Sequence, residues 1–62
     1  MAGKMIEVEG FKAFRGSMRI IADRGNSAFV IHGEWLYKPE TNCWYCNGNS
    51  YFAPYCEVLE VY

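Results

Sequence analysis

The sequence predicts an all-β domain, either a five- to six-stranded SH3-like barrel or a small rolled sheet. Three observations lead to this fold class. Apolar and polar residues alternate in several short stretches, turn residues separate these stretches, and no window carries the apolar stripe of an amphipathic helix. A chain of 62 residues is expected to form one domain, residues 1–62. An OB-like barrel is disfavoured because that fold usually needs a longer chain and a helix.

Three strands are expected in the first half of the chain, at residues 5–9, 17–22 and 28–32. Each alternates in the manner of the first, where Ile6 and Val8 lie on the face opposite Glu7 and Glu9. Residues 10–16 are bounded by two glycines, and we interpret them as a long loop. The stretch from Asp23 to Ser27 is expected to turn, since Gly and Asn accept positive φ angles.

The third strand is expected to continue over residues 34–38 after a bend or bulge at Gly33. Further strands are expected at residues 43–47, 50–53 and 57–62. Pro39–Asn42 is expected to form a tight turn, and Asn47-Gly48 is the strongest hairpin signal in the chain. A single 3₁₀ turn at Ala53–Cys56 would precede the last strand.

The composition and charge of the chain indicate its cellular compartment and the classes of partner that it can bind. The formal net charge is −1, with no polybasic run or acidic block, and no apolar stretch is long enough to span a bilayer. Residues 1–4 lack the apolar core of a secretory signal. The three cysteines are an odd number, which favours free thiols over a disulfide scaffold. We therefore expect a cytoplasmic protein that does not act at a membrane.

No catalytic or metal site is expected. Cys43 and Cys46 have zinc-knuckle spacing, and Cys56 and His32 would complete a Cys₃His site. However, if residues 43–46 form a regular strand, Cys43 and Cys46 point to opposite faces, so we expect no bound zinc and no other cofactor. His32 is the only histidine, and no nucleophile, base and orienting group can be assembled around it. The chain is therefore expected not to be an enzyme.

Aromatic residues are more abundant than so small a fold can easily hide, and such residues are enriched at interface hot spots. Two groups are candidates for contact with a partner: the segment from Phe11 to Arg19, which interleaves aromatics with cations, and the aromatics of residues 35–45. The predicted partner-binding residues are Phe11, Lys12, Phe14, Arg15, Arg19, Trp35, Tyr37, Trp44 and Tyr45. Two alternatives remain for the first group: a loop that covers the open end of the barrel with Phe11 and Phe14, or a reader of single-stranded nucleic acid.

Two segments of the chain resemble other small proteins, and the resemblance indicates a biological role. Residues 33–45, Gly-Glu-Trp-Leu-Tyr-Lys-Pro-Glu-Thr-Asn-Cys-Trp-Tyr, together with residues 14–20, resemble small uncharacterised proteins of phages and prophages of Gram-positive bacteria. The resemblance covers about two-thirds of the chain and carries over no binding residue. It implies an inhibitor of host defence, a class that includes the anti-CRISPR proteins, in the cytoplasm of a bacterial host.

The sequence therefore predicts a non-enzymatic binding module that blocks a host protein complex by protein–protein contact. The alternatives are a small-barrel nucleic-acid-binding protein and an oligomeric sponge for a nucleotide signal. Because the burial available to 62 residues barely offsets the loss of conformational entropy, we also expect self-association, with a homodimer as the simplest form.

Overall fold

The computed structural model describes residues 3–62, apart from the side chain of Asp23, and confirms a small all-β fold. Met1 and Ala2, which begin the segment expected to lack a secretory signal, lie outside the described residues. The strands are β1 (Ile6–Val8), β2 (Phe11–Ala22), β3 (Ser27–Lys38), β4 (Cys43–Cys46), β5 (Asn49–Phe52) and β6 (Cys56–Val61). Two short 3₁₀ segments, η1 (Asp23–Gly25) and η2 (Ala53–Tyr55), complete the described elements, and neither is long or apolar enough to cross a membrane.

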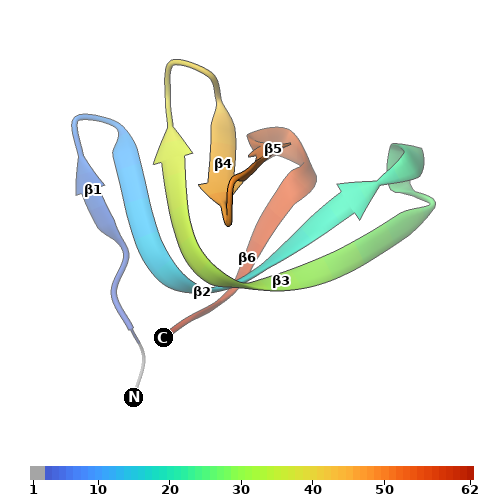
Figure 1. Cartoon of the computed structure of the whole chain (residues 1–62), viewed down its shortest axis with the longest axis horizontal. Helices are drawn as coiled ribbons and strands as arrows, with labels where there is room; N and C mark the ends of the chain where they lie inside the picture. Colours follow the sequence, from blue (N-terminus) through green and yellow to red (C-terminus); the bar gives the residue numbers. More distant parts are fainter. Residues whose placement is uncertain (1–2) are drawn as a thin grey trace.

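All six strands belong to one antiparallel sheet that is rolled but not closed. The order is β1-β2-β3-β4-β5, and β6 pairs with β2 on the side that β1 also uses. The long strands β2 and β3 run together through the whole sheet and bend strongly in the middle (Figure 1). Among the described strands β5 pairs only with β4, so the rolled sheet, and not a closed SH3-like barrel, is the form that this chain adopts.

The expected turns are confirmed where the sequence supplies residues that accept a positive φ. Asn47 and Gly48 have φ angles of 52° and 80° and join β4 to β5 as a two-residue hairpin turn. Asn42 ends the Pro39–Asn42 turn with φ 53°. Ala53–Tyr55 forms the expected 3₁₀ turn before β6, with Pro54 inside it.

The loop predicted for residues 10–16 is wrong. Glu9 and Gly10, with φ angles of 52° and 89°, make a tight turn, and β2 begins directly after it at Phe11. The error arises from treating Gly16 as the end of a loop. By contrast, the expected continuation of the third strand past Gly33 is confirmed, since β3 is one strand that bends in its middle (Figure 1).

These two glycines instead allow strands to approach one another. Gly16 and Gly33 face each other across β2 and β3. A Cβ atom on Gly16 would lie 1.9 Å from the backbone oxygen of Glu60 in β6, and one on Gly33 would lie 2.9 Å from Sγ of Cys46. The glycine pair thus lets β6 and β4 pack against the middle of the sheet, where β2 and β3 bend.

The core lies on one face of the sheet, which we call the inner face. Its buried apolar residues are Phe14, Met18, Ile20, Trp35, Trp44 and Cys46. Trp35 is 2% exposed, and the rings of Phe14 and Trp44 meet edge to face with centroids 5.4 Å apart. The two tryptophans and Phe14 supply much of the apolar burial in this small core.

Candidate partner-binding surface

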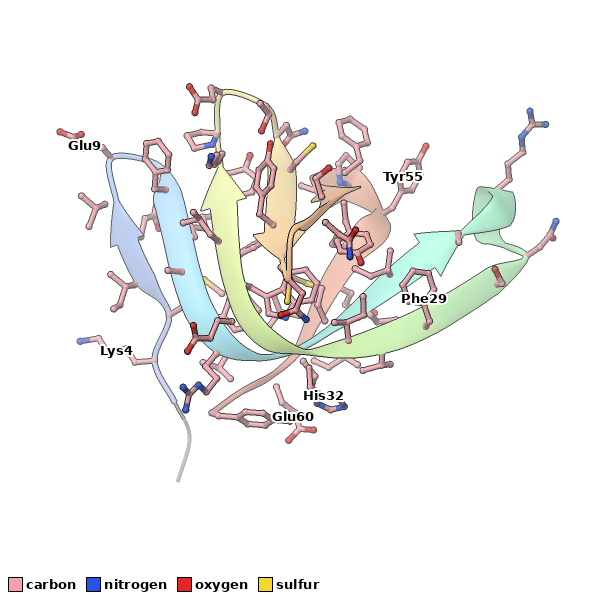
Figure 2. All side chains as sticks on the ribbon, in the orientation of Figure 1. Lys4, Glu9, Phe29, His32, Tyr55 and Glu60 are labelled. Atoms are coloured by element: carbon pink, nitrogen blue, oxygen red, sulfur yellow. The ribbon has the colours of Figure 1, made fainter. Side chains whose placement is uncertain are left out.

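The predicted partner-binding residues divide by strand parity into two opposite faces. Phe14 lies opposite Trp35, and Lys12 lies opposite Tyr37, on the inner face. The face on the other side of the sheet, which we call the outer face, carries Phe11, Arg15, Arg19 and Tyr45. Figure 2 shows this alternation on β3, where Phe29 points to the concave inner side and His32 points away from it.

Three of the predicted contact residues are buried and form no exposed surface. Phe14, Trp35 and Trp44 are 5%, 2% and 7% exposed, respectively. The reason is that residues 11–22 form a strand instead of a loop, so that Phe14 faces inward beside the two tryptophans. These three side chains contribute to the stability of the core and, because they are buried, they offer little surface to a partner.

The half-buried tyrosines are engaged within the chain. The hydroxyl of Tyr37 donates a hydrogen bond to Oδ1 of Asn42 at 2.6 Å, and the hydroxyl of Tyr45 lies 2.9 Å from Oγ1 of Thr41. The ammonium groups of Lys12 and Lys38 lie over the rings of Tyr37 and Tyr45, 5.5 and 4.9 Å from the centroids. The hydroxyl and one face of each of these tyrosine rings are therefore already in contact within the chain.

Both arginines of the predicted surface are paired with glutamates on neighbouring strands. Nη2 of Arg15 donates to Oε1 of Glu34 at 2.9 Å, and Nη1 of Arg19 lies 3.5 Å from Oε1 of Glu57. These side chains are well exposed, so the pairs add little to stability, but each glutamate cancels the charge of its arginine. Lys12 lies on the opposite face of the sheet, so the cations of residues 11–19 do not form one basic patch.

A continuous apolar surface lies instead on the outer face, across β1, β2 and β3. Ile6 is opposite Ala13, which is opposite Leu36, and Val8 is opposite Phe11. These five residues define what we call the outer apolar face. The exposed fractions are 58% for Ile6, 60% for Val8, 39% for Phe11 and 38% for Leu36. Tyr45 extends the surface onto β4 because it pairs with Leu36.

The outer apolar face is bordered by a shallow groove and by charges. The groove has a volume of about 530 Å³ and runs along Ile6 and Leu36 towards Lys4, Arg15 and Glu34. Lys38 lies at the other end of the surface, above Tyr45. An apolar centre with a charged rim is the arrangement found in many protein interfaces.

Of this surface, the sequence-based prediction identified only Phe11 and Tyr45. It missed Ile6, Val8 and Leu36. The alternation of Ile6 and Val8 is visible in the sequence, but their place beside Phe11 depends on a hairpin turn at Glu9-Gly10, close to where the sequence predicts the start of a loop. Leu36 is not predicted because its aromatic neighbours Trp35 and Tyr37, which face the other way, belong to the residue types enriched at interfaces.

The cysteines do not assemble with histidine. β4 is a regular strand with Cys43 on the outer face and Cys46 on the inner face, as expected from alternation. Among the side chains that the structure describes, which exclude that of Asp23, no group of three or more His, Cys, Asp or Glu is arranged to hold a metal ion. His32 stacks on the ring of Tyr62, whose hydroxyl lies 2.9 Å from Nδ1 of His32.

Two of the thiols are held in the protonated form. Burial, with a smaller contribution from the charge of Glu34, raises the pKa of Cys46 above 9.0. Burial, followed by the charge of Cys43, raises the pKa of Cys56 to about 11. Because the thiolate is the form that attacks electrophiles and binds metals, both environments oppose thiolate chemistry at neutral pH.

Comparisons with protein-family models, with curated proteins and with solved structures found no match to this chain.

Proposed function

We propose that this chain is a non-enzymatic binding module that attaches to a protein partner through the outer apolar face. The observation that carries the proposal is the set of four large apolar side chains, 38–60% exposed, that adjoin one another across three strands. Leaving such residues in water is unfavourable, and contiguous exposed apolar patches on small domains commonly mark interaction sites.

A protein partner fits this surface better than a nucleic acid. Nucleic-acid binding depends on cations that are free to meet phosphates. Here Arg15 and Arg19 are each paired with a glutamate, Lys12 lies on the other face, and the formal net charge of the chain is −1. By contrast, an apolar partner surface would bury Ile6, Val8 and Leu36 without the loss of any hydrogen bond.

The biological setting that we propose is inhibition of a host defence complex by a phage- or prophage-encoded protein. This part rests on the resemblance of residues 14–20 and 33–45 to small phage and prophage proteins. A binding module with no catalytic centre would act in that setting by occupying a surface that the host complex needs.

The test is affinity capture from bacterial lysate with three forms of the chain. The wild type is compared with the double variant Ile6→Ser/Val8→Ser and with the control Leu59→Ser, which makes the same change at a residue of β6 that is 45% exposed. We expect a protein that the wild type and the control retain and that the double variant loses by at least about tenfold. Retention by all three forms would refute the outer apolar face as the contact surface. Capture that disappears after nuclease treatment would refute a protein partner.

The setting is tested separately by plating phage on bacteria that express the chain together with an active defence system. We expect phage titres to rise with the wild type and not with Ile6→Ser/Val8→Ser. Unchanged titres across a panel of defence systems would contradict the inhibitor role and leave the protein-binding role to be judged by the capture experiment.

A further inference from the structure

One long strand edge of the sheet has no neighbour. β3 pairs with β2 along almost its whole length, from Ser27 to Tyr37, but with β4 only at Leu36–Lys38. In the described part of the chain, therefore, no strand lies on the other side of Ala28–His32. Figure 1 shows this half of β3 separating from β4 and continuing to the far end of the sheet, beside the second half of β2.

The residues of this edge favour pairing with another strand. Ala28–His32 reads Ala-Phe-Val-Ile-His and contains no Lys, Arg, Asp, Glu, Pro or Gly. Phe29 and Val30 are 43% and 47% exposed. Aromatic and β-branched residues favour strands, and an edge without charge or proline presents unpaired N–H and C=O groups that a second strand can use.

The other edges carry features that oppose pairing. β1 is three residues long and contains Glu7, and β5 is four residues long. β6 is longer, but Glu57 and Glu60 place negative charge along it. Short length and charge are the usual protections of edge strands, and among the described edges of the sheet only Ala28–His32 lacks both.

We propose that two copies of this chain pair through this edge, antiparallel, about a two-fold axis at Val30. In this register Val30 lies opposite Val30 of the second copy, Phe29 lies opposite Ile31, and Ala28 lies opposite His32. The two six-stranded sheets then become one continuous sheet.

Self-pairing suits this segment because its residues match one another. No like charges come together in the register centred on Val30, because the one ionisable residue of the segment, His32, lies opposite Ala28. Phe29 meets the β-branched Ile31 twice, once on each side of the axis, and aromatic–β-branched pairs are among the favourable cross-strand pairs. The paired segment also has clear limits in the chain. The turn at Asp23–Asn26 precedes it, and Gly33, which packs against Sγ of Cys46, follows it.

Val30 provides a charge test with an internal rescue. Val30 lies opposite Arg19 on β2, so the variant Val30→Glu places a carboxylate beside an arginine within one copy, where it is tolerated. In the dimer the same variant places two glutamates opposite each other at the axis. We expect sedimentation of the wild type to show a dimer at about tens of micromolar, and Val30→Glu to dissociate about tenfold more readily or further.

The rescue is an equimolar mixture of Val30→Glu and Val30→Lys. Each variant alone is expected to be monomeric, and the mixture is expected to form a heterodimer because opposite charges then meet at the axis. Leu59→Glu is the matched control, since it adds the same charge at an exposed residue of β6 and should leave the dimer unchanged. Circular dichroism verifies that each variant is folded.

Hydrogen exchange of the wild type provides a measurement that needs no variant. The amides of residues 28–32 are expected to become more protected as protein concentration rises. A wild type that stays monomeric, a Val30→Glu variant that dimerises as the wild type does, or a dimer that Val8→Glu dissociates instead would each overturn the proposal. The last of these outcomes would assign the dimer contact to the outer apolar face. If Val30→Glu no longer retained a host protein in the affinity capture, the edge at Ala28–His32 would instead be assigned to that protein.

Discussion

Phe11 and Phe14 are three residues apart on one strand, and we expect the same substitution to have different consequences at the two positions. Phe14 is 5% exposed and its ring meets Trp44 on the inner face, whereas Phe11 is 39% exposed on the outer face. Phe14→Ala is therefore expected to cost much more stability than Phe11→Ala, which also removes part of the proposed contact surface.

The magnitudes follow from burial. Replacing a buried Phe by Ala costs about 3–5 kcal/mol because a cavity remains in the core. A domain of this size has a total stability of about 3–9 kcal/mol at roughly 0.05–0.15 kcal/mol per residue, so Phe14→Ala is expected to unfold a large part of the population. Phe11 is about 60% removed from water. Taking about 1.5–3 kcal/mol for complete burial, Phe11→Ala should cost about 1–2 kcal/mol.

The assay is urea denaturation followed by tryptophan fluorescence, with all variants at one protein concentration because self-association would shift the midpoint. Phe14→Leu extends the series with a smaller cavity and an expected cost of about 1–2 kcal/mol. We expect Phe14→Ala to show little or no folded baseline, and Phe11→Ala to unfold cooperatively at a midpoint about 1 M lower than the wild type. Equal midpoints for the two alanine variants would refute the assignment of the two rings to opposite faces.

Three further predictions concern single residues. Gly16→Ala is expected to cost stability near the upper end of about 1–3 kcal/mol, because its Cβ would lie 1.9 Å from the backbone oxygen of Glu60. Gly33→Ala should cost less in the same urea titration, because its Cβ would lie 2.9 Å from a side-chain atom, Sγ of Cys46. Ser17→Ala should raise the free energy of unfolding by about 1 kcal/mol, because Ser17 is 1% exposed and its Oγ has no hydrogen-bond partner among the described residues; a loss of stability in calorimetry would contradict this. The pKa of Cys56 is raised to about 11, so the folded state retains a proton that the unfolded state loses above pH 9.0, and the free energy of unfolding should fall between these two pH values. Cys56→Ala should reduce this fall in urea titrations at several pH values. The same pH dependence in Cys56→Ala and in the wild type would contradict this role of Cys56.

Turn residues explain how much of the fold could be predicted from the sequence. Asn47-Gly48 and Asn42 fix the second half of the sheet locally, since each position needs a positive φ that its residue type accepts. The strands between these turns then alternate as expected, with Trp44 and Cys46 inward and Cys43 outward. Here the information lies within a few neighbouring residues.

The first half of the sheet depended on contacts that are distant in sequence. Nothing near Gly16 indicates that its hydrogen atom faces a carbonyl of Glu60, more than forty residues later in the sequence. Without that contact, two glycines around a mixed aromatic and cationic segment are typical of a loop. In a loop, the spacing of Phe11 and Phe14 does not indicate which face each ring occupies. In the strand β2 it does, and it places Phe14 in the core and Phe11 on the outer face.

The same bend that creates the core also creates both proposed contact surfaces. β4 and β5 cover the inner face beside the first half of β2, where Phe14 meets Trp35 and Trp44. β4 pairs with β3 only at Leu36–Lys38, the last residues of β3, so the edge at Ala28–His32 has no neighbouring strand among the described elements. On the outer side β1 adds apolar residues to Phe11 and Leu36, but none of the described elements packs over them. Residues 3–62 provide six strands and two short 3₁₀ segments, and none of these elements covers either surface. Under the two proposals, a protein partner or a second copy of the chain would remove these apolar residues from water.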